Sequence, residues 1–273
     1  MKKFNLYLIF SIIVIITYCC ISFIQSENYP WLEDVIYLIA PISAFIAGLF
    51  LVKKFNLKSY QGWALFFLVL GMFIFTLGEL TWVYLFYIEG VEPYPSIADI
   101  FFLGVYPISL IGLLIKVKAE KFTWSLENLK KYFIFPVISF IVAALVVYFG
   151  IYSAYIPEDS YASNVVSMLY GVGDLILIFA CFFVLIITIE YKKGKMFFPW
   201  LLITLSYSVL LIADVLFSAN KDAYDASITM TVMIDSIWIA GYFIFGLGMI
   251  KFLEIIEGQE GSILKRLNAE KGV

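Results

Sequence analysis

Histidine is absent from this sequence of 273 residues, and only three cysteines are present. Without histidine, the chain cannot form a His-ligated metal site or a serine–histidine catalytic triad. The cysteine count is odd and all three lie in apolar surroundings, which favours a packing role over a disulfide framework for Cys19, Cys20 and Cys181. We therefore predict no cofactor and no metal site, and we expect a protein that is not an enzyme.

Charged residues are also scarce, at 14%, whereas hydrophobic residues make up 63% of the chain and the mean hydropathy is +0.97. This composition is incompatible with the surface of an ordinary soluble domain. A helix needs roughly 20 apolar residues to cross a bilayer, so the sequence predicts an all-α integral membrane protein with eight transmembrane helices. The predicted spans are 5–24, 33–52, 62–88, 97–116, 132–153, 163–190, 198–219 and 229–251.

The positions of lysine and arginine predict the orientation of these spans. Of 18 basic residues, 17 fall at the termini or in alternate gaps between spans, and only Lys221 lies on the opposite side. Basic residues collect on the cytoplasmic side of membrane proteins, so both termini of this multi-pass chain are expected in the cytoplasm, with the cell membrane as its location. The opposite loops are acidic and are expected to face outward.

Comparison of the chain with itself indicates a duplication at an offset of about 136 residues, most clearly in the fourth and eighth spans. Both contain an acid with aromatic residues at plus three and plus seven, a spacing that places the three side chains on one helix face. The two copies are Asp99, Phe102 and Tyr106, and Asp235, Trp238 and Tyr242. We predict a single domain, 1–251, built as a parallel 4+4 tandem repeat of about 1–118 and 130–251. A shared apolar, aromatic-rich composition would also produce such a likeness.

Six acids lie within the predicted spans or at their outer ends: Asp34, Glu79, Asp99, Asp174, Asp214 and Asp235. A carboxylate at the centre of a bilayer costs about 2.5 to 3.5 kcal/mol on insertion scales, so these groups are expected to face protein or water. Asp34 and Asp99 begin their spans and either cap a helix N-terminus or bind a ligand. The other four are protonated, belong to a hydrogen-bonded network, or hold a cation.

Aromatic residues lie close in sequence to these acids, and aromatic faces together with carboxylates attract organic cations and amines. We therefore predict an acidic, aromatic-lined pocket in the outer half of the bundle, for a small cationic ligand or a proton. Its predicted ligand-binding residues are Glu79, Asp99, Asp174, Asp214, Asp235, Trp82, Tyr106, Trp238 and Tyr242. For any one of the aromatic residues, packing in the core or against lipid is the alternative.

Two short motifs resemble a known family. The stretch from Pro93 to Pro107, which reads Pro-Tyr-Pro-Ser-Ile-Ala-Asp-Ile-Phe-Phe-Leu-Gly-Val-Tyr-Pro, and the stretch from Asp235 to Tyr242 resemble multi-helix membrane sensory modules of bacterial and archaeal signalling proteins. In those proteins the module lies at the N-terminus and precedes PAS, diguanylate cyclase or histidine kinase domains. The resemblance, which covers residues 1–251 in outline, implies a sensory input role in signal transduction.

The end of the chain departs from that pattern, because residues 252–273 are too few for a signalling domain. Gly258 and Gly261 are expected to interrupt a loosely amphipathic helix in this short cytoplasmic tail. The tail is expected to lie on the membrane surface, or to dock a cytoplasmic signalling partner or a second copy of the chain, unless the chain is a fragment of a longer signalling protein.

The leading functional prediction is a non-enzymatic membrane sensory or ligand-binding module. The first alternative is a small secondary transporter coupled to protons or cations, which should carry polar residues into the cytoplasmic half. That half is almost wholly apolar in this sequence, which favours a sensor. Two further alternatives are an intramembrane enzyme that uses Glu79 and Asp99 as a carboxylate pair, and an accessory subunit of a membrane complex. The lipid bilayer is the expected partner, and no nucleic acid is expected.

Overall fold

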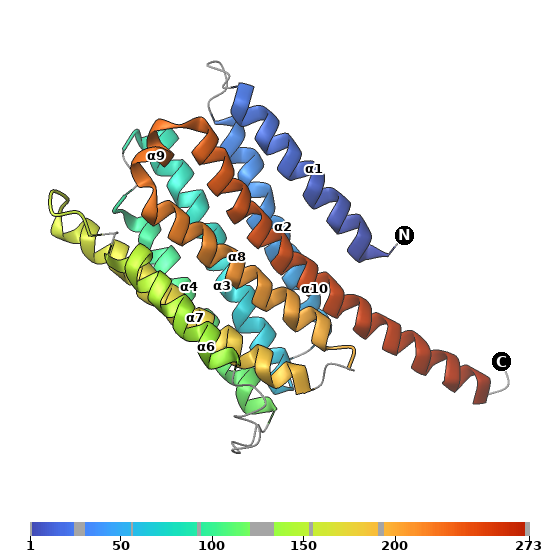
Figure 1. Ribbon diagram of the computed structural model, residues 1–273. Helices are drawn as coiled ribbons and strands as arrows, with labels where there is room; N and C mark the ends of the chain where they lie inside the picture. The colour runs from blue at the N-terminus through green and yellow to red at the C-terminus, as the bar shows by residue number, and fades with distance from the viewer. Residues whose placement is uncertain are drawn as a thin grey trace.

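The computed structural model describes residues 2–24, 31–55, 57–91, 94–120, 134–152, 155–190 and 194–270, without the side chains of 134–136, 189–190 and 260–270. These residues contain helices and no strand (Figure 1). Seven helices within them are long and apolar enough to cross a membrane, which confirms an all-α fold suited to a multi-pass membrane protein. They are α1 (Lys3–Ile24), α2 (Leu32–Phe55), α3 (Tyr60–Tyr84), α4 (Ile97–Ala119), α7 (Tyr161–Glu190), α8 (Phe197–Ala219) and α10 (Ile228–Glu270).

The predicted span 132–153 corresponds to a shorter element. Helix α6 (Ile134–Leu145) continues into the π-helical segment η2 (Val146–Tyr152), while residues 132, 133 and 153 lie outside the described ranges. Its apolar part, Val137–Tyr152, covers about 24 Å at about 1.5 Å per residue, less than the hydrocarbon thickness of about 30 Å. Seven of the eight predicted spans are thus confirmed as long apolar helices, and this one stays a prediction.

Two further short elements lie beside the long helices. The π-helical segment η1 (Leu85–Glu89) extends α3, and the six-residue helix α9 (Lys221–Ala226) connects α8 to α10. Helix α9 lies in the gap between the predicted spans 198–219 and 229–251, for which no helix was predicted. Ser59 begins α3 by accepting a hydrogen bond from the Gly62 N–H at 3.0 Å, which satisfies one of the free N–H groups of the first turn.

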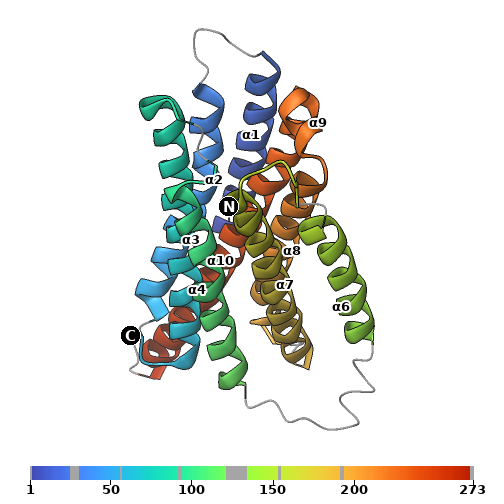
Figure 2. The same cartoon turned by 90° about the vertical axis from the view of Figure 1, so that its left-hand side faces the viewer.

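The two ends of the bundle carry different charges. With α6 counted among them, the helices that cross the bundle run in alternating directions (Figures 1 and 2). One end, called the basic end below, contains the start of α1, the end of α2 and the end of α4, with Lys3, Lys53 and Lys116. The other, called the acidic end, contains η1, α9 and the starts of α2, α4 and α10. In the described part of the chain, Lys221 is the one basic residue at the acidic end.

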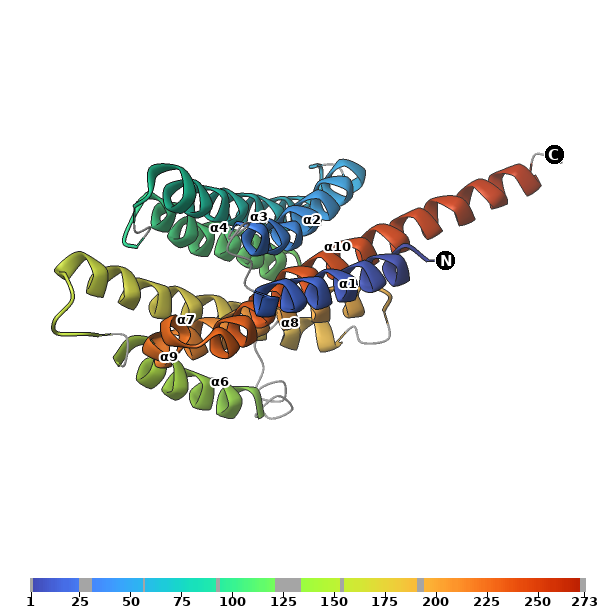
Figure 3. The same ribbon diagram turned by 90° about the horizontal axis from the view of Figure 1, so that it is seen from above.

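The helices form two groups with α10 between them. Seen from above, α2, α3 and α4 make one layer, and α6 to α9 make the other, while α10 and α1 run between the layers (Figure 3). Helix α3 packs closely on α4, and α8 packs closely on α10. Contacts of α2 with α10 and of α4 with α7 join the groups, whereas α6 lies at the edge of the bundle (Figure 2).

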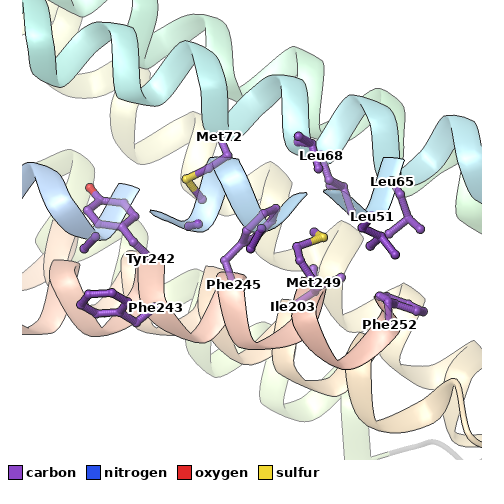
Figure 4. Close-up of a cluster of buried hydrophobic side chains, with 14 of the residues drawn as sticks. Leu51, Leu65, Leu68, Met72, Ile203, Tyr242, Phe243, Phe245, Met249 and Phe252 are labelled. Atoms are coloured by element: carbon purple, nitrogen blue, oxygen red, sulfur yellow. The ribbon is translucent and has the colours of Figure 1, made fainter. Parts of the chain in front are cut away.

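The half of the bundle toward the basic end is a closed apolar core. Its side chains interdigitate between α2, α3, α8 and α10, from Tyr242 at one end to Phe252 at the other (Figure 4). Residues of this core that are fully buried are Leu51, Leu65, Leu68, Leu113, Ile203, Phe245, Met249 and Phe252. Burial of such side chains stabilises a fold by about 1.5 to 3 kcal/mol each when the alternative is exposure to water.

Helix α10 is longer than expected. It is continuous for 43 residues, or about 65 Å, and it passes through Gly258 and Gly261, so the predicted interruption at these glycines is wrong. The start of the predicted tail lies in the core, because Phe252 is fully buried and packs edge-on against Trp200 at 5.7 Å. The end of α10 extends past the other helices (Figures 1 and 3).

The N-terminal helix is fastened to α10 at the basic end. Lys3 Nζ lies 2.7 Å from Glu257 Oε1, and the Phe4 N–H donates to Glu254 Oε1 at 2.9 Å. The Lys3 pair is partly exposed, so it stabilises this contact by less than about 1 kcal/mol. The contacts nevertheless fix the position of α1 along α10 and bring Tyr18 of α1 to the level of Asp235.

Candidate functional site: an acid–aromatic network

Asp235 on α10 is held by two tyrosines from other elements. The Tyr18 hydroxyl of α1 donates to Asp235 Oδ2 at 2.5 Å, and the Tyr224 hydroxyl of α9 donates to Oδ1 at 2.9 Å. The Asp235 side chain is only 8% exposed. Because both of its oxygens accept a short hydrogen bond, Asp235 joins α1, α9 and α10 and has little freedom to move.

Glu79 on α3 is held more loosely. Tyr37 of α2 and Tyr242 of α10 both direct their hydroxyls at Glu79 Oε1, at 3.4 and 3.3 Å, and the two hydroxyls lie 3.3 Å from each other. Hydroxyl-to-oxygen bonds are usually 2.5 to 3.0 Å long, so this triangle of oxygens is more open than a closed hydrogen-bond network. Edge-to-face contact between the Tyr37 and Tyr242 rings, with centroids 6.1 Å apart, holds the triangle in place.

Asp34 of α2 completes this group. It accepts a hydrogen bond from the Tyr87 hydroxyl of η1 at 2.6 Å, and both Asp34 and Asp235 are close enough to Glu79 to interact with it electrostatically. The acid cluster, as it is called below, therefore consists of three carboxyl groups surrounded by tyrosine hydroxyls. Its residues are Asp34, Glu79 and Asp235, with Tyr18, Tyr37, Tyr87, Tyr224 and Tyr242.

A second group lies between α7 and α8. The carboxyl groups of Asp174 and Asp214 are close enough to share a hydrogen bond. Tyr106 of α4 donates to Asp174 Oδ1 at 2.9 Å, and the Trp238 indole N–H of α10 donates to Asp214 Oδ1 at 2.7 Å. This carboxyl pair thus connects four helices, and a hydrogen bond between its two members requires a proton on one of them.

Asp99 has a structural role at the start of α4. Its Oδ2 accepts the Ser96 N–H at 2.6 Å, while Ser96 accepts from the Ala98 N–H at 3.1 Å, which makes a capping box. Its other oxygen, Oδ1, accepts the hydroxyl of Tyr170 on α7 at 2.6 Å. Of the two predicted roles for Asp99, the helix cap is therefore confirmed.

Tyrosines outside the membrane-spanning helices remain hydrogen-bond donors. Burial, followed by the nearby charge of Asp235, raises the pKa of Tyr224 well above its ordinary value. Burial likewise raises the pKa of Tyr94, whose hydroxyl contacts the Ser163 carbonyl oxygen at 3.1 Å and the Ser167 hydroxyl. Both hydroxyls therefore stay protonated at neutral pH, and Tyr224 continues to donate to Asp235.

No lysine or arginine forms an ion pair with the six acids in the ranges that the structure describes. The ion pairs seen there join Lys3 to Glu257, Lys116 to Glu120 and Lys251 to Glu254, all at the basic end. The same ranges contain no group of three acids or cysteines spaced to hold a metal ion. Within the described ranges, the side chains that hydrogen-bond to the carboxyl groups of the acid cluster are therefore tyrosines.

The predicted site residues fall into neighbouring groups. Glu79, Asp235 and Tyr242 belong to the acid cluster, and a second set surrounds the carboxyl pair: Asp174, Asp214, Tyr106 and Trp238. Trp82 stacks on Phe86 at 5.3 Å, and in the described residues it donates no hydrogen bond to an acid. The predicted site residues did not include four tyrosines of the acid cluster: Tyr18, Tyr37, Tyr87 and Tyr224. A hydroxyl within the apolar first span was the available signal for Tyr18, whereas nothing local marks Tyr224.

Comparison with known proteins adds nothing to this geometry. No protein family, curated protein or solved structure matches the chain significantly.

Proposed function

We propose that this chain is a non-enzymatic sensory module of the cell membrane that binds a small organic cation at the acid cluster. The observation that carries the proposal is the set of three carboxyl groups, one buried and two half-buried, met by five tyrosine hydroxyls and by no basic side chain in the described residues. A cation offsets the cost of carboxylates in a medium of low dielectric constant. The tyrosine rings add cation–π contacts.

Glu79 is the carboxyl group best suited to contact the ligand. Asp235 has both oxygens in short hydrogen bonds, whereas Glu79 accepts only two long bonds, both on Oε1. Replacing these by one charge-assisted bond from an ammonium N–H, about 2.7 to 2.9 Å long, is favourable. Asp34 and Asp235 then serve to hold the surrounding tyrosines and to add negative potential.

The closed core supports a sensor over a transporter. A transported ion would have to pass from the acid cluster to the basic end through the level of Leu68, Phe245 and Met249, where the buried side chains interdigitate and, apart from a few hydroxyl groups such as that of Ser109, are apolar (Figure 4). A sensor needs no such path. It needs only an element that responds to the ligand, and α10 carries both Asp235 and Tyr242 and runs unbroken to Glu270.

The proposal includes the duplicated architecture and the orientation inferred from the sequence. Eight spans in a parallel 4+4 arrangement make α4 the counterpart of α10, and α2 the counterpart of α7. Contacts of α3 with α4 and of α8 with α10 then correspond, as do contacts of α4 with α7 and of α10 with α2, which supports duplication. With the basic end in the cytoplasm, the acid cluster lies near the outer face, and α10 passes the signal to a cytoplasmic partner or to a second copy of the chain.

Ligand binding tests the proposal. For the purified chain in lipid nanodiscs, titration with a series of alkylamines and tetraalkylammonium ions is expected to raise the melting temperature of the parent protein. Glu79→Gln keeps the side-chain shape but removes the charge, and we expect about tenfold weaker binding or more, equivalent to about 1.4 kcal/mol. Isothermal titration calorimetry measures the affinity.

The matched control is Glu89→Gln. Glu89 also accepts a hydrogen bond from a tyrosine, Tyr84, at 2.5 Å, but it is exposed and lies outside the acid cluster. Binding by this variant is expected to equal that of the parent. Equal affinities for Glu79→Gln, Glu89→Gln and the parent, or no binding of any amine by the parent, would reject the cation site.

A further inference from the structure

Three hydrogen-bond donors at the basic end are buried, and two of them have no partner. The indole Nε1 of Trp200 and the amide Nε2 of Gln61 lack an acceptor among the described residues. The third donor is the ammonium group of Lys116, whose side chain is only 5% exposed. An unpartnered buried donor costs about 1 to 3 kcal/mol, so such groups indicate an acceptor outside the described residues.

Lys116 and Trp200 are in direct contact. Lys116 lies in the last turn of α4, and its Nζ stands 5.0 Å from the centroid of the Trp200 ring, in the first turn of α8. Trp200 is completely buried. Because the Lys116 ammonium lies over the ring while the Trp200 N–H lies at the ring edge, both donors belong to one small region between α4 and α8.

Gln61 lies near the face of α3 that packs against α4. The two helices come into close backbone contact at Gly112, where an added Cβ would lie 2.8 Å from the Ala64 carbonyl oxygen. One turn nearer the basic end, the residue on the same face of α4 is Lys116 and the residue on the same face of α3 is Gln61. The contact of Lys118 with the Tyr60 ring, at 5.7 Å, confirms this register.

The N-terminus of α8 adds positive potential to the region. Helix α8 begins at Phe197, and Met196 at its N-cap provides no side-chain hydrogen bond to the first turn. The free N–H groups and the helix dipole at such an end favour an anion. One carboxylate is present, because Glu120 pairs with Lys116, but Glu120 is partly exposed and reaches neither unpartnered N–H in the described structure.

We propose that Gln61, Lys116 and Trp200 form a binding site for a phosphate group, carried by the headgroup of an anionic lipid. Three donors of fixed position and one positive charge match the several acceptor oxygens of a phosphate. The site lies at the level of Lys58, Lys118 and Lys195, where the helices end, as expected for a headgroup at the membrane surface. This proposal is independent of the acid cluster at the other end.

Glu120 competes with a phosphate for one donor of the site. Its carboxylate accepts a hydrogen bond from the Lys116 ammonium group, which a bound phosphate would also use. Removing the Glu120 charge should therefore strengthen lipid binding, which is the opposite of what a supporting residue of the site would show. The direction of this change in lipid binding distinguishes a competing residue from one that binds the ligand.

Native mass spectrometry of the full chain in detergent tests the site. With phosphatidylglycerol as the probe, Trp200→Phe keeps the ring under Lys116 but removes the N–H, and we expect about fivefold weaker lipid retention or more. Gln61→Glu places a negative charge at the part-exposed edge of the site and is expected to weaken retention further. Glu120→Gln is expected to increase retention, and the control Lys221→Gln, at the acidic end, to leave it unchanged.

Two further arms identify the source of the phosphate. The parent should retain phosphatidylcholine more weakly than phosphatidylglycerol. All variants should retain phosphatidylcholine to the same extent as the parent. Inorganic phosphate at millimolar concentrations should not raise the melting temperature of the parent. If it does, and if the effect is lost in the Trp200 and Gln61 variants, the site binds the free anion and not a lipid headgroup. Unchanged phosphatidylglycerol retention in both Trp200→Phe and Gln61→Glu would overturn the site itself.

Discussion

A Gly112→Leu variant is expected to have a free energy of unfolding about 3 kcal/mol lower than that of the parent protein. At Gly112 the backbones of α3 and α4 approach so closely that an added Cβ would lie 2.8 Å from the Ala64 carbonyl oxygen and 3.2 Å from the Leu68 N–H nitrogen. Backbone atoms cannot rotate out of the way as side chains do, so the two helices must separate. That separation opens the core around Leu65 and Leu113.

Gly258→Leu provides the matched control for this prediction. Gly258 also lies within a long helix, but nothing stands within 4 Å of its added Cβ. Leucine favours the helix over glycine by somewhat less than about 1 kcal/mol, so this variant should be as stable as the parent or slightly more stable. Thermal and denaturant unfolding in a mild detergent compares the three proteins. Equal stability of the two leucine variants would show that α3 and α4 do not pack at Gly112.

The long helices could be predicted because their signal is local. A window of roughly 20 apolar residues is sufficient for a span whatever it packs against, and α1, α2, α4 and α8 each contain one. The capping box at Ser96 and Asp99 is equally local, because both partners lie within one turn. Local signals of this kind need no knowledge of the tertiary structure.

The end of α10 could not be predicted in the same way. Gly258 and Gly261 each disfavour a helix by about 1 kcal/mol relative to alanine, which makes an interruption reasonable from the sequence. In the structure, the turn before them is anchored by the buried Phe252 and by the contact of α1 with Glu254 and Glu257. Most helical stability comes from such packing, which the sequence does not display.

The sequence predicted that the acids face inward, because a carboxylate is costly in lipid. It did not predict which side chains donate hydrogen bonds to them. Tyr18 and Asp235 are separated by 217 residues, and Tyr242 and Glu79 by 163. Pairing them requires knowing that α1 and α3 both lie against α10. Proximity in sequence instead favoured Trp82, which is three residues from Glu79 but stacks on Phe86.

Removing the tyrosine hydroxyls that join α4 to α7 should produce the other large loss of stability. The two helices exchange hydrogen bonds reciprocally, because Tyr106 of α4 donates to Asp174 of α7 at 2.9 Å and Tyr170 of α7 donates to Asp99 of α4 at 2.6 Å. Tyr106→Phe and Tyr170→Phe each remove the tyrosine donor from one oxygen of a buried carboxyl group, which costs about 2 kcal/mol. The double variant is expected to lose about 4 kcal/mol.

Tyr207→Phe shows whether the carboxyl acceptor is the cause. Tyr207 has the same hydroxyl and also reaches α4, but it donates to a neutral acceptor, Ser109 Oγ, at 2.9 Å. Hydrogen bonds between neutral groups in membrane proteins contribute about 0.6 kcal/mol on average, so this variant should be nearly as stable as the parent. If all three single variants unfold at the same denaturant concentration, the acids do not hold the two groups of helices together. A larger loss for Tyr106 and Tyr170 alone means that hydrogen bonds to Asp99 and Asp174 hold α4 against α7.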